Sequence, residues 1–144
     1  MAKSKFQKYT FETISREDIK NADYNPRIMD KEAKKRLKKN LKENGLVSAI
    51  TWNRRTGNVV GGHQRLEQLD SLEKNKNYSL DVCVVDVDER EEAKLNVILN
   101  NTSLQGEYDL EGLALLTEEF DVSFEEMGFT KLDIDFMFTS FKQF

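Results

Sequence analysis

The chain has 144 residues, a net charge of −4, 33% charged residues and 38% hydrophobic residues. This length suffices for one domain with its own hydrophobic core, and the 10% aromatic content argues against a disordered chain. One cysteine and one histidine exclude an internal disulfide and a zinc site of the usual sulfur and nitrogen type. No apolar run of about 18 residues could span a membrane, and no apolar stretch follows the basic start, so we expect a cytoplasmic protein.

The charge is divided unevenly along the chain. Residues 1–55 contain 15 Lys/Arg and 7 Asp/Glu, whereas residues 56–144 contain 7 Lys/Arg and 19 Asp/Glu. Basic residues are densest in residues 31–42, and such a face suits contact with nucleic-acid phosphates. A solvated helix face balanced by the acidic half is the alternative. The candidate DNA contacts are Lys34, Lys38 and Lys42.

Local signals divide the first part of the chain into a strand and a helix. Residues 10–14 are predicted to form a strand, followed by a capping box in which the side chain of Ser15 caps one short helical turn. Asp30 and Gly45 are suitable start and stop residues for a helix over residues 31–44. Its inward stripe is Ala33, Leu37 and Leu41.

Two strands and a helix are predicted next. Residues 46–52 are predicted to be a strand, residues 54–58 a hairpin turn, and Val59-Val60 a second strand that ends at Gly61-Gly62. A helix is expected from His63 to Lys74, because leucines recur on one face.

The following strand is predicted to be covered on both faces. Residues 80–87 contain four consecutive apolar residues, which is typical of such a strand. Cys83 belongs to this run and is expected in the core rather than as a nucleophile. Asp88 and Glu91 predict a capped helix that ends near Asn101.

Residues 107–144 are expected to be an acidic helical extension to a domain formed by residues 1–106. The extension contains ten Asp/Glu but only Lys131 and Lys142. Its apolar residues predict two short helices, the second capped by Thr130. Their apolar faces would pack on the chain itself or bind a partner.

The chemistry is concentrated at the turn between residue 59 and residue 66. Glycine allows close backbone approach and positive φ, and the first amides of a helix favour a negative ligand. We therefore predict a phosphate-binding turn at Gly61-Gly62, with Arg65 as a charged, forked donor. A plain bend at the end of a hairpin strand is the alternative on these grounds alone.

This turn resembles a motif of the ParB/sulfiredoxin superfamily. Residues 61–66, Gly-Gly-His-Gln-Arg-Leu, are similar to the box that opens a helix in ParB N-terminal domains and to the Gly-Gly-Cys-His-Arg turn of sulfiredoxins. Residues 25–27 resemble the family's Asn-Pro-Arg motif, residues 44–50 its helix-Gly-Leu-strand segment, and residues 95–101 its Glu-Asn box. The resemblance covers residues 10–104 and implies an α+β fold with a small mixed sheet flanked by helices.

The resemblance also implies a ligand and its contacts. The ligand would be a nucleoside triphosphate, ATP or CTP, with Mg²⁺ carried by the nucleotide. The implied phosphate contacts are Gly61, Gly62, His63, Gln64 and Arg65, with Asn25 and Arg27 closing the site from the opposite side. Asn100 and Asn101 would make a second contact with the nucleotide or metal.

Departures from the family narrow these expectations. His63 stands where sulfiredoxins have their catalytic cysteine, so sulfinic-acid repair is not expected. Gln64 replaces one arginine of the ParB pair and removes one phosphate donor. Asn100-Asn101 matches the Glu-Asn box only loosely, so catalytic residues are not assigned. No segment corresponds to the helix-turn-helix that reads specific DNA, so any DNA binding is expected to be non-specific.

Three functions follow from the sequence. The first is a nucleotide-binding ParB-like module in the DNA transactions of a phage or mobile element, with or without weak nucleoside triphosphatase or nuclease activity. The second is a non-enzymatic adaptor that docks a DNA methyltransferase or other protein, since residues 106–130 resemble a segment that follows ParB-like domains in such elements. The third is a small-molecule, serine-type kinase, whose candidate bases are Glu17, Asp18 and Glu43.

Overall fold

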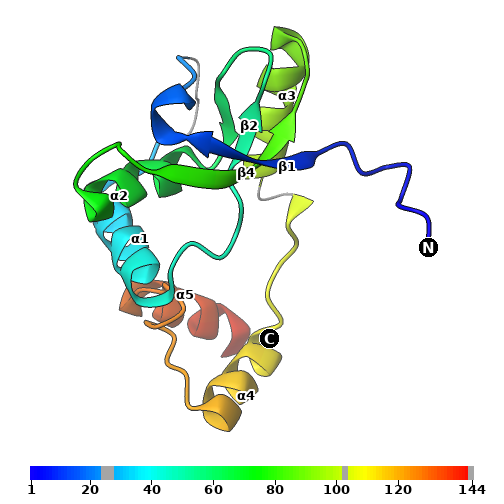
Figure 1. Cartoon of the computed structure of the whole chain (residues 1–144). Helices are drawn as coiled ribbons and strands as arrows, with labels where there is room; N and C mark the ends of the chain where they lie inside the picture. Colours follow the sequence, from blue (N-terminus) through cyan, green and yellow to red (C-terminus); the bar gives the residue numbers. More distant parts are fainter. Residues whose placement is uncertain (24–27, 102–103, 143–144) are drawn as a thin grey trace. The chain divides into compact units, whose positions relative to one another are not determined.

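The computed structural model describes residues 1–23, 28–101 and 104–142 (Figure 1). Contacts divide the chain into two compact units, Met1–Asn101 and Thr102–Phe144. Among the described residues, no helix has the length and apolar character needed to cross a membrane.

The first unit is a four-stranded mixed sheet with helices, so the expected α+β class is confirmed. The strand order is β1-β4-β2-β3, with β1–β4 and β2–β3 antiparallel and β2–β4 parallel. Its elements are β1 (Thr10–Ser15), the 3₁₀ turn η1 (Arg16–Asp18), α1 (Lys31–Asn44), β2 (Thr51–Asn53), β3 (Val59–Gly61), α2 (His63–Glu73), β4 (Ser79–Val85) and α3 (Glu89–Asn100).

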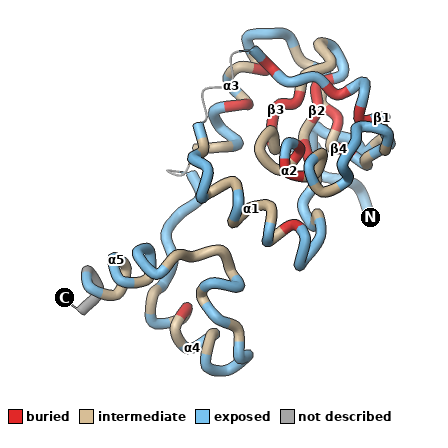
Figure 2. The backbone as a smooth tube through the Cα atoms, turned by 90° about the vertical axis from the view of Figure 1, so that its left-hand side faces the viewer, coloured by how far each residue is buried: buried red, intermediate tan, exposed pale blue. Residues whose placement is uncertain are grey.

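The hydrophobic core lies between the sheet and α2. Leu66 of α2 is fully buried and packs with side chains from three strands. Figure 2 shows buried segments of these strands beside α2. Since side chains alternate along a strand, Val82 and Val84 face this core and Cys83 points to the other face. The buried cluster is Ile19, Ile50, Trp52, Val59, Leu66, Val82 and Val84.

Two expectations about β4 need correction: that both of its faces are covered, and that Cys83 lies in the core. The strand alternates between more buried and more exposed residues, so its two faces are not equally covered. Cys83 is therefore half-buried and lies outside the core cluster. Burial nevertheless raises the pKa of its thiol, which argues against a nucleophilic role.

Helix boundaries agree with the local signals. The carboxylate of Asp30 accepts a hydrogen bond from the Ala33 amide at 2.7 Å, and Asp88 accepts one from the Glu91 amide at 2.9 Å. Gly45 ends α1 with a φ of 80°. These caps confirm the predicted starts of α1 and α3.

Two local predictions are wrong. The side chain of Ser15 makes no cap hydrogen bond, since Ser15 pairs with Ser79 in the sheet and η1 is held by the Arg16 amide on the Tyr78 carbonyl at 2.8 Å. The strand expected over residues 46–52 is confined to β2 at Thr51–Asn53. The segment before β2 contacts the first turn of α2 instead, because the Ser48 carbonyl accepts a hydrogen bond from Arg65.

The second unit contains α4 (Leu110–Phe120) and α5 (Lys131–Lys142), which contact each other. Thr130 and Asp133 exchange side chain-to-amide hydrogen bonds of 3.0 and 2.8 Å, so the predicted cap of the second helix is confirmed. The ring of Phe124 lies edge-on to the rings of Phe129 and Phe138, with centroids 6.1 and 5.5 Å apart.

Candidate phosphate-binding site

The turn between β3 and α2 requires glycine at its second position. Gly62 has a φ of 99°, and a Cβ atom there would lie 2.9 Å from Ile50 Cγ1 and 3.0 Å from Arg65 Nη2. A Cβ atom at Gly61 would lie 3.0 Å from Leu99 Cδ1. The backbone can adopt this turn, and a ligand can approach it closely, only because side chains are absent.

The first turn of α2 carries no local acid or cap that would occupy its amides. Its N-cap is Gly62, which has no side chain, and no Asp or Glu lies in the first turn. The first intrahelical bond runs from the Leu66 amide to the Gly62 carbonyl at 2.9 Å. The amides before it have no intrahelical acceptor, and the helix dipole adds positive potential there.

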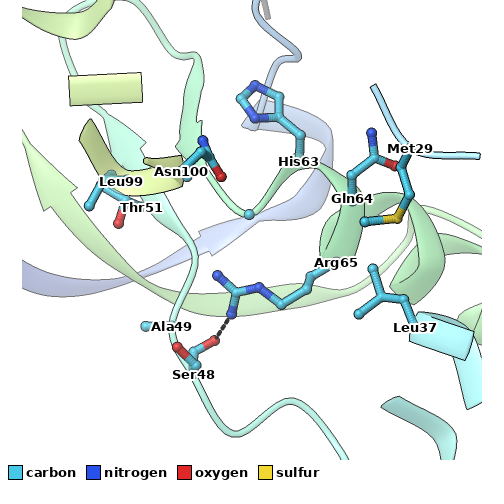
Figure 3. Close-up of a pocket in the computed structure, with 12 residues that line it drawn as sticks. Met29, Leu37, Ser48, Ala49, Thr51, His63, Gln64, Arg65, Leu99 and Asn100 are labelled. Carbon is cyan, nitrogen blue, oxygen red and sulfur yellow. Dashed lines mark hydrogen bonds between the residues drawn. The ribbon is translucent and has the colours of Figure 1, made fainter. Parts of the chain in front are cut away.

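Arg65 adds a full positive charge beside this helix start. Its Nη1 donates to the backbone carbonyl of Ser48 at 2.5 Å, and its Nη2 lies close to Gly62 (Figure 3). The segment before β2 thus fixes the guanidinium group under the glycine turn.

A pocket of about 390 Å³ opens at this turn. It contains no Asp or Glu among its described lining residues, and Arg65 is their one permanent charge. The lining residues are Met29, Leu37, Ser48, Ala49, Thr51, Gly61, Gly62, His63, Gln64, Arg65, Leu99 and Asn100.

The fold was compared with known proteins. No family model and no curated protein matches the sequence. The structure is similar to that of the C-terminally truncated chromosome-partitioning protein ParB from Caulobacter crescentus complexed with CTP-γ-S, with a TM-score of 0.61, 18% identity and coverage of 82% of this chain and 68% of that chain. The chain has a ParB-like fold. A Pnob8-like ParB-N domain matches with a TM-score of 0.49 and 21% identity, over 61% of this chain and 34% of that chain.

The ParB-like fold brings together most of the residues that the sequence singled out. All five residues from Gly61 to Arg65 line the pocket, and Asn100 joins them from the end of α3. Asn101 is not among the lining residues, and Asn25 and Arg27 lie outside the described residues.

Other lining residues had no local signal in the sequence. Thr51 reaches the turn because β2 pairs with β3, which places it opposite Gly61. Leu99 reaches it because α3 packs on β3, where the side-chain Nδ2 of Asn96 donates to the Val60 carbonyl at 3.1 Å. Met29, Leu37, Ser48 and Ala49 complete the set.

His63 and Gln64 each have a buried side-chain atom without a hydrogen-bond partner. These atoms are Nε2 of His63 and Oε1 of Gln64, and neither is paired within the described structure. Burial lowers the pKa of His63, although the negative charge of Glu92 acts in the opposite direction. The imidazole is therefore neutral near neutral pH.

A buried ion pair lies beyond His63, beside a second pocket of about 420 Å³. The guanidinium of Arg16 donates two hydrogen bonds of 2.8 Å to Asp70, which also accepts one of 2.5 Å from Tyr78. Burial alone would raise the pKa of Asp70, but these hydrogen bonds outweigh it and lower the pKa. The pair ties η1 to α2, and no local pattern in the sequence predicted it.

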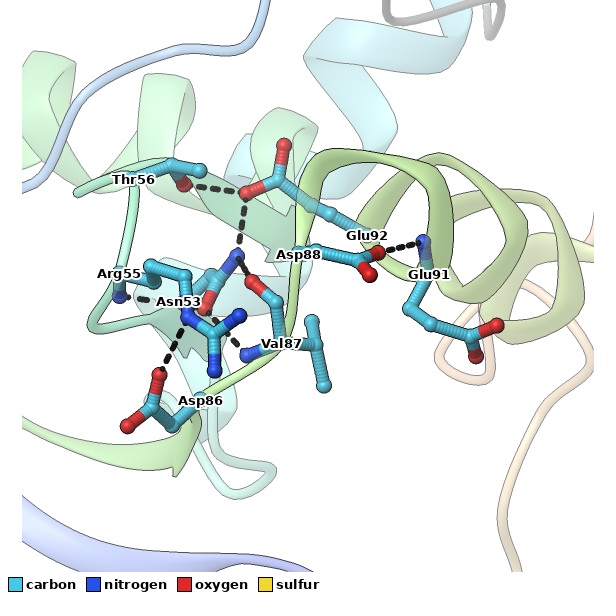
Figure 4. Close-up of polar contacts among 8 residues, drawn as sticks. All are labelled: Asn53, Arg55, Thr56, Asp86, Val87, Asp88, Glu91 and Glu92. Atoms are coloured by element: carbon cyan, nitrogen blue, oxygen red, sulfur yellow. Dashed lines mark hydrogen bonds and ion pairs between the residues drawn. The ribbon is translucent and has the colours of Figure 1, made fainter.

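A second buried network surrounds Glu92, which is 1% exposed. Its carboxylate accepts hydrogen bonds from Asn53 at 2.8 Å and from the hydroxyl of Thr56 (Figure 4). The side chain of Asn58 donates a third hydrogen bond at 3.2 Å. The side chain of Asn53 also donates from Nδ2 to the Val87 carbonyl at 3.0 Å and accepts at Oδ1 from the Val87 amide at 3.1 Å. The network joins the β2–β3 turn to α3, and Thr56, Asn58 and Glu92 also line a third pocket of about 670 Å³.

The remaining candidate residues lie elsewhere. None of Glu17, Asp18 and Glu43 is among the described residues that line the pocket at the turn. No group of three His, Cys, Asp or Glu is arranged for a metal ion in the described part of the chain. In α1, Lys34 pairs with Glu67 at 3.3 Å.

Proposed function

We propose that this chain is a nucleotide-binding module that holds the phosphates of a nucleoside triphosphate at the start of α2. The observation that carries the proposal is the left-handed Gly62, packed against Arg65 at a helix start without a side-chain cap. Backbone amides, the helix dipole and a forked cation together favour a phosphate group over a neutral ligand.

The lining of the pocket fits the rest of a nucleotide. Met29, Leu37 and Ala49 provide apolar surface for a sugar or base, and the pocket of about 390 Å³ suits a small organic ligand. CTP is the first ligand to test because the similar Caulobacter protein was solved with a CTP analogue, and ATP is the second. We further propose that Asn25 and Arg27 close the site and that Asn101 supports Asn100.

The proposed module binds nucleotide more readily than it hydrolyses it. Efficient hydrolysis needs a base or a metal to activate water, and no carboxylate lines the described part of the pocket. Mg²⁺ would arrive with the nucleotide phosphates. Any nucleoside triphosphatase or nuclease activity would accordingly be weak.

A thermal-shift screen with CTP, ATP, GTP and ADP in Mg²⁺ tests the proposal. A nucleotide at 100 times its Kd should stabilise the fold by about 2.7 kcal/mol. If no nucleotide, sulfate or pyrophosphate raises the unfolding temperature, the assignment of the turn as a phosphate site is wrong.

DNA contact through α1 is a second proposed property of the module. Lys38 and Lys42 form no ion pair within the described structure, whereas Lys34 is partly neutralised by Glu67. Such lysines neutralise DNA phosphates without reading sequence. Changing Lys34, Lys38 and Lys42 to Glu should weaken binding equally for unrelated duplexes and flatten its salt dependence; unchanged binding at low salt would contradict the proposal.

The second unit favours a protein partner over DNA. Its acidic surface repels DNA, and several large apolar side chains on it are exposed. They are Leu115, Leu116, Phe120, Leu132 and Phe136. We propose that this unit docks a protein, such as a DNA methyltransferase encoded by the same phage or mobile element. Co-purification of a methyltransferase with the full chain, but not with a Phe120→Ser, Phe136→Ser variant, tests this.

A further inference from the structure

His63 is half-buried, and its side chain carries one buried nitrogen with an unmet hydrogen bond at the proposed phosphate site. Its Nε2 has no partner in the described chain, and the residue lines both the pocket at the glycine turn and the adjoining pocket of about 420 Å³. Native proteins leave few buried polar groups unpaired, and those that remain call for an explanation such as a ligand. Oε1 of Gln64, the next residue, is unpaired in the same way.

The geometry places His63 where an anion could reach it. It is the first residue of α2, directly after Gly62, and its ring lies on the other side of the turn from the guanidinium group of Arg65 (Figure 3). An anion held by the first amides of α2 would therefore lie between an arginine and an imidazole. An imidazole can donate two hydrogen bonds, and carries a positive charge, only when it is protonated.

In the protein alone, the surroundings of His63 oppose that protonation. Burial is the larger effect, and the positive end of the α2 dipole acts in the same direction. Of the carboxylates near the ring, Asp70 pairs with Arg16 and Glu67 with Lys34. The negative charge of Glu92, whose carboxylate accepts three hydrogen bonds, acts in the opposite direction to burial. The charged groups around the ring are Arg16, Arg65, Glu67, Asp70, Lys76 and Glu92.

We propose that His63 is a contact residue for the bound phosphate and takes up a proton as the anion binds. This rests on the proposed function, because it needs an anion at the glycine turn. The incoming negative charge would offset the burial of the imidazolium, and Nε2–H would donate the hydrogen bond that it lacks in the protein alone. Binding would then be linked to pH through one identified side chain.

The sign of the linkage follows from the two states. His63 would have a higher pKa in the complex than in the protein alone, so the complex binds more protons between these two pKa values. Affinity therefore rises as the pH falls through the pKa of the complex. It levels off below the pKa of the unliganded protein, which burial holds under the ordinary imidazole value.

The sequence makes the direct measurement unambiguous, because His63 is the one histidine of the chain. Its imidazole would be titrated by NMR from about pH 8 to about pH 5, with and without saturating inorganic sulfate. Sulfate keeps its charge across this range, whereas the terminal phosphate of a nucleotide does not. We expect sulfate to raise the pKa of His63 by at least about one pH unit, which equals a tenfold change in affinity.

A His63→Gln variant provides the second arm. Calorimetry should show that the sulfate affinity of the wild-type protein rises at least about tenfold across that range, whereas the affinity of the variant changes little. Mg²⁺–CTP, measured in buffers of different ionisation enthalpy, should bind with proton uptake in the wild type and with less uptake in the variant. The amide spectrum of the variant would show that it is folded, and the NMR titration needs no variant.

The outcomes separate the two ideas. If sulfate shifts the amide signals of Gly61 and Gly62 but leaves the titration of His63 unchanged, the proton linkage is wrong and the phosphate site stands. If neither sulfate nor CTP binds at any pH, both are wrong. If sulfate raises the pKa of His63 in the wild type, and the sulfate affinity of the variant does not change with pH, both the phosphate site and the proton linkage are supported.

Discussion

Two buried polar clusters flank the same sheet, and they differ in whether their hydrogen bonds are complete. The carboxylate of Glu92 accepts bonds from three donors and holds the β2–β3 turn to α3. At the glycine turn, His63 and Gln64 each keep a buried atom unpaired within the described structure. A complete network stabilises the fold by itself, whereas an incomplete one costs free energy until a ligand completes it.

The largest expected effect comes from breaking the complete cluster. Glu92→Ala removes the acceptor that the side chains of Asn53, Thr56 and Asn58 share, so the free energy of unfolding should fall by about 3 kcal/mol or more. Urea unfolding measures this. Glu91→Ala, a more exposed neighbour on the same helix, is the control and should cost about 0.5 kcal/mol or less. A loss below about 1 kcal/mol for Glu92→Ala would show that the network is not structural.

The glycine turn should respond next most strongly, in both stability and binding. Gly62→Ala combines a positive φ with a Cβ atom 2.9 Å from Ile50, so we expect a loss of about 2 kcal/mol in stability and the loss of anion binding. Gly57→Ala is matched, since its φ is 80° but its Cβ would have ordinary contacts of 3.6 Å or more. It should cost about 1 kcal/mol and retain binding. Equal effects of the two variants would mean that close packing at Gly62 is unimportant.

Arg65→Ala should affect binding and leave the fold intact. A hydrogen bond to a charged group contributes roughly 1.5–3 kcal/mol, so the affinity for CTP or sulfate should fall at least about tenfold. Arg55→Ala is the control because Arg55 is exposed and pairs with Asp86 at 3.0 Å, away from the pocket. Calorimetry measures the affinity of both variants for CTP or sulfate. An unchanged affinity in Arg65→Ala would refute the assignment of the phosphate site.

The two clusters also differ in how far the sequence could reveal them. The glycine turn could be predicted because Gly61, Gly62 and Arg65 are adjacent in the chain, and the caps at Asp30 and Asp88 are equally local. The start of β2 could not be predicted from local patterns, because it depends on contacts between segments that are distant in the sequence.

The same limit applies to the network around Glu92. It joins residues more than 30 positions apart, and nothing near Glu92 in the sequence marks it as buried. The pocket wall formed by Thr51 and Leu99 follows from strand pairing and helix packing, which local patterns do not specify. Local signals thus predicted the glycine turn at the start of α2, but neither the wall of the pocket beside it nor the network around Glu92.

The smallest expected effect is also the sharpest comparison of the two clusters. Gln64→Met removes a buried oxygen that has no partner, so the stability of the unliganded protein should stay the same or rise by up to about 1 kcal/mol. Thr56→Val removes a hydroxyl that donates to Glu92 and accepts from the Asn58 amide at 3.1 Å, and should cost about 1–2 kcal/mol despite its nearly equal volume. Nucleotide affinity should show the opposite order, because Gln64 lines the pocket and Thr56 does not. Urea unfolding and calorimetry on the two variants provide both measurements. A loss of stability in Gln64→Met as large as that in Thr56→Val would mean that the Gln64 side chain is satisfied within the protein, and the distinction between a structural and a ligand-facing cluster would fail at that residue.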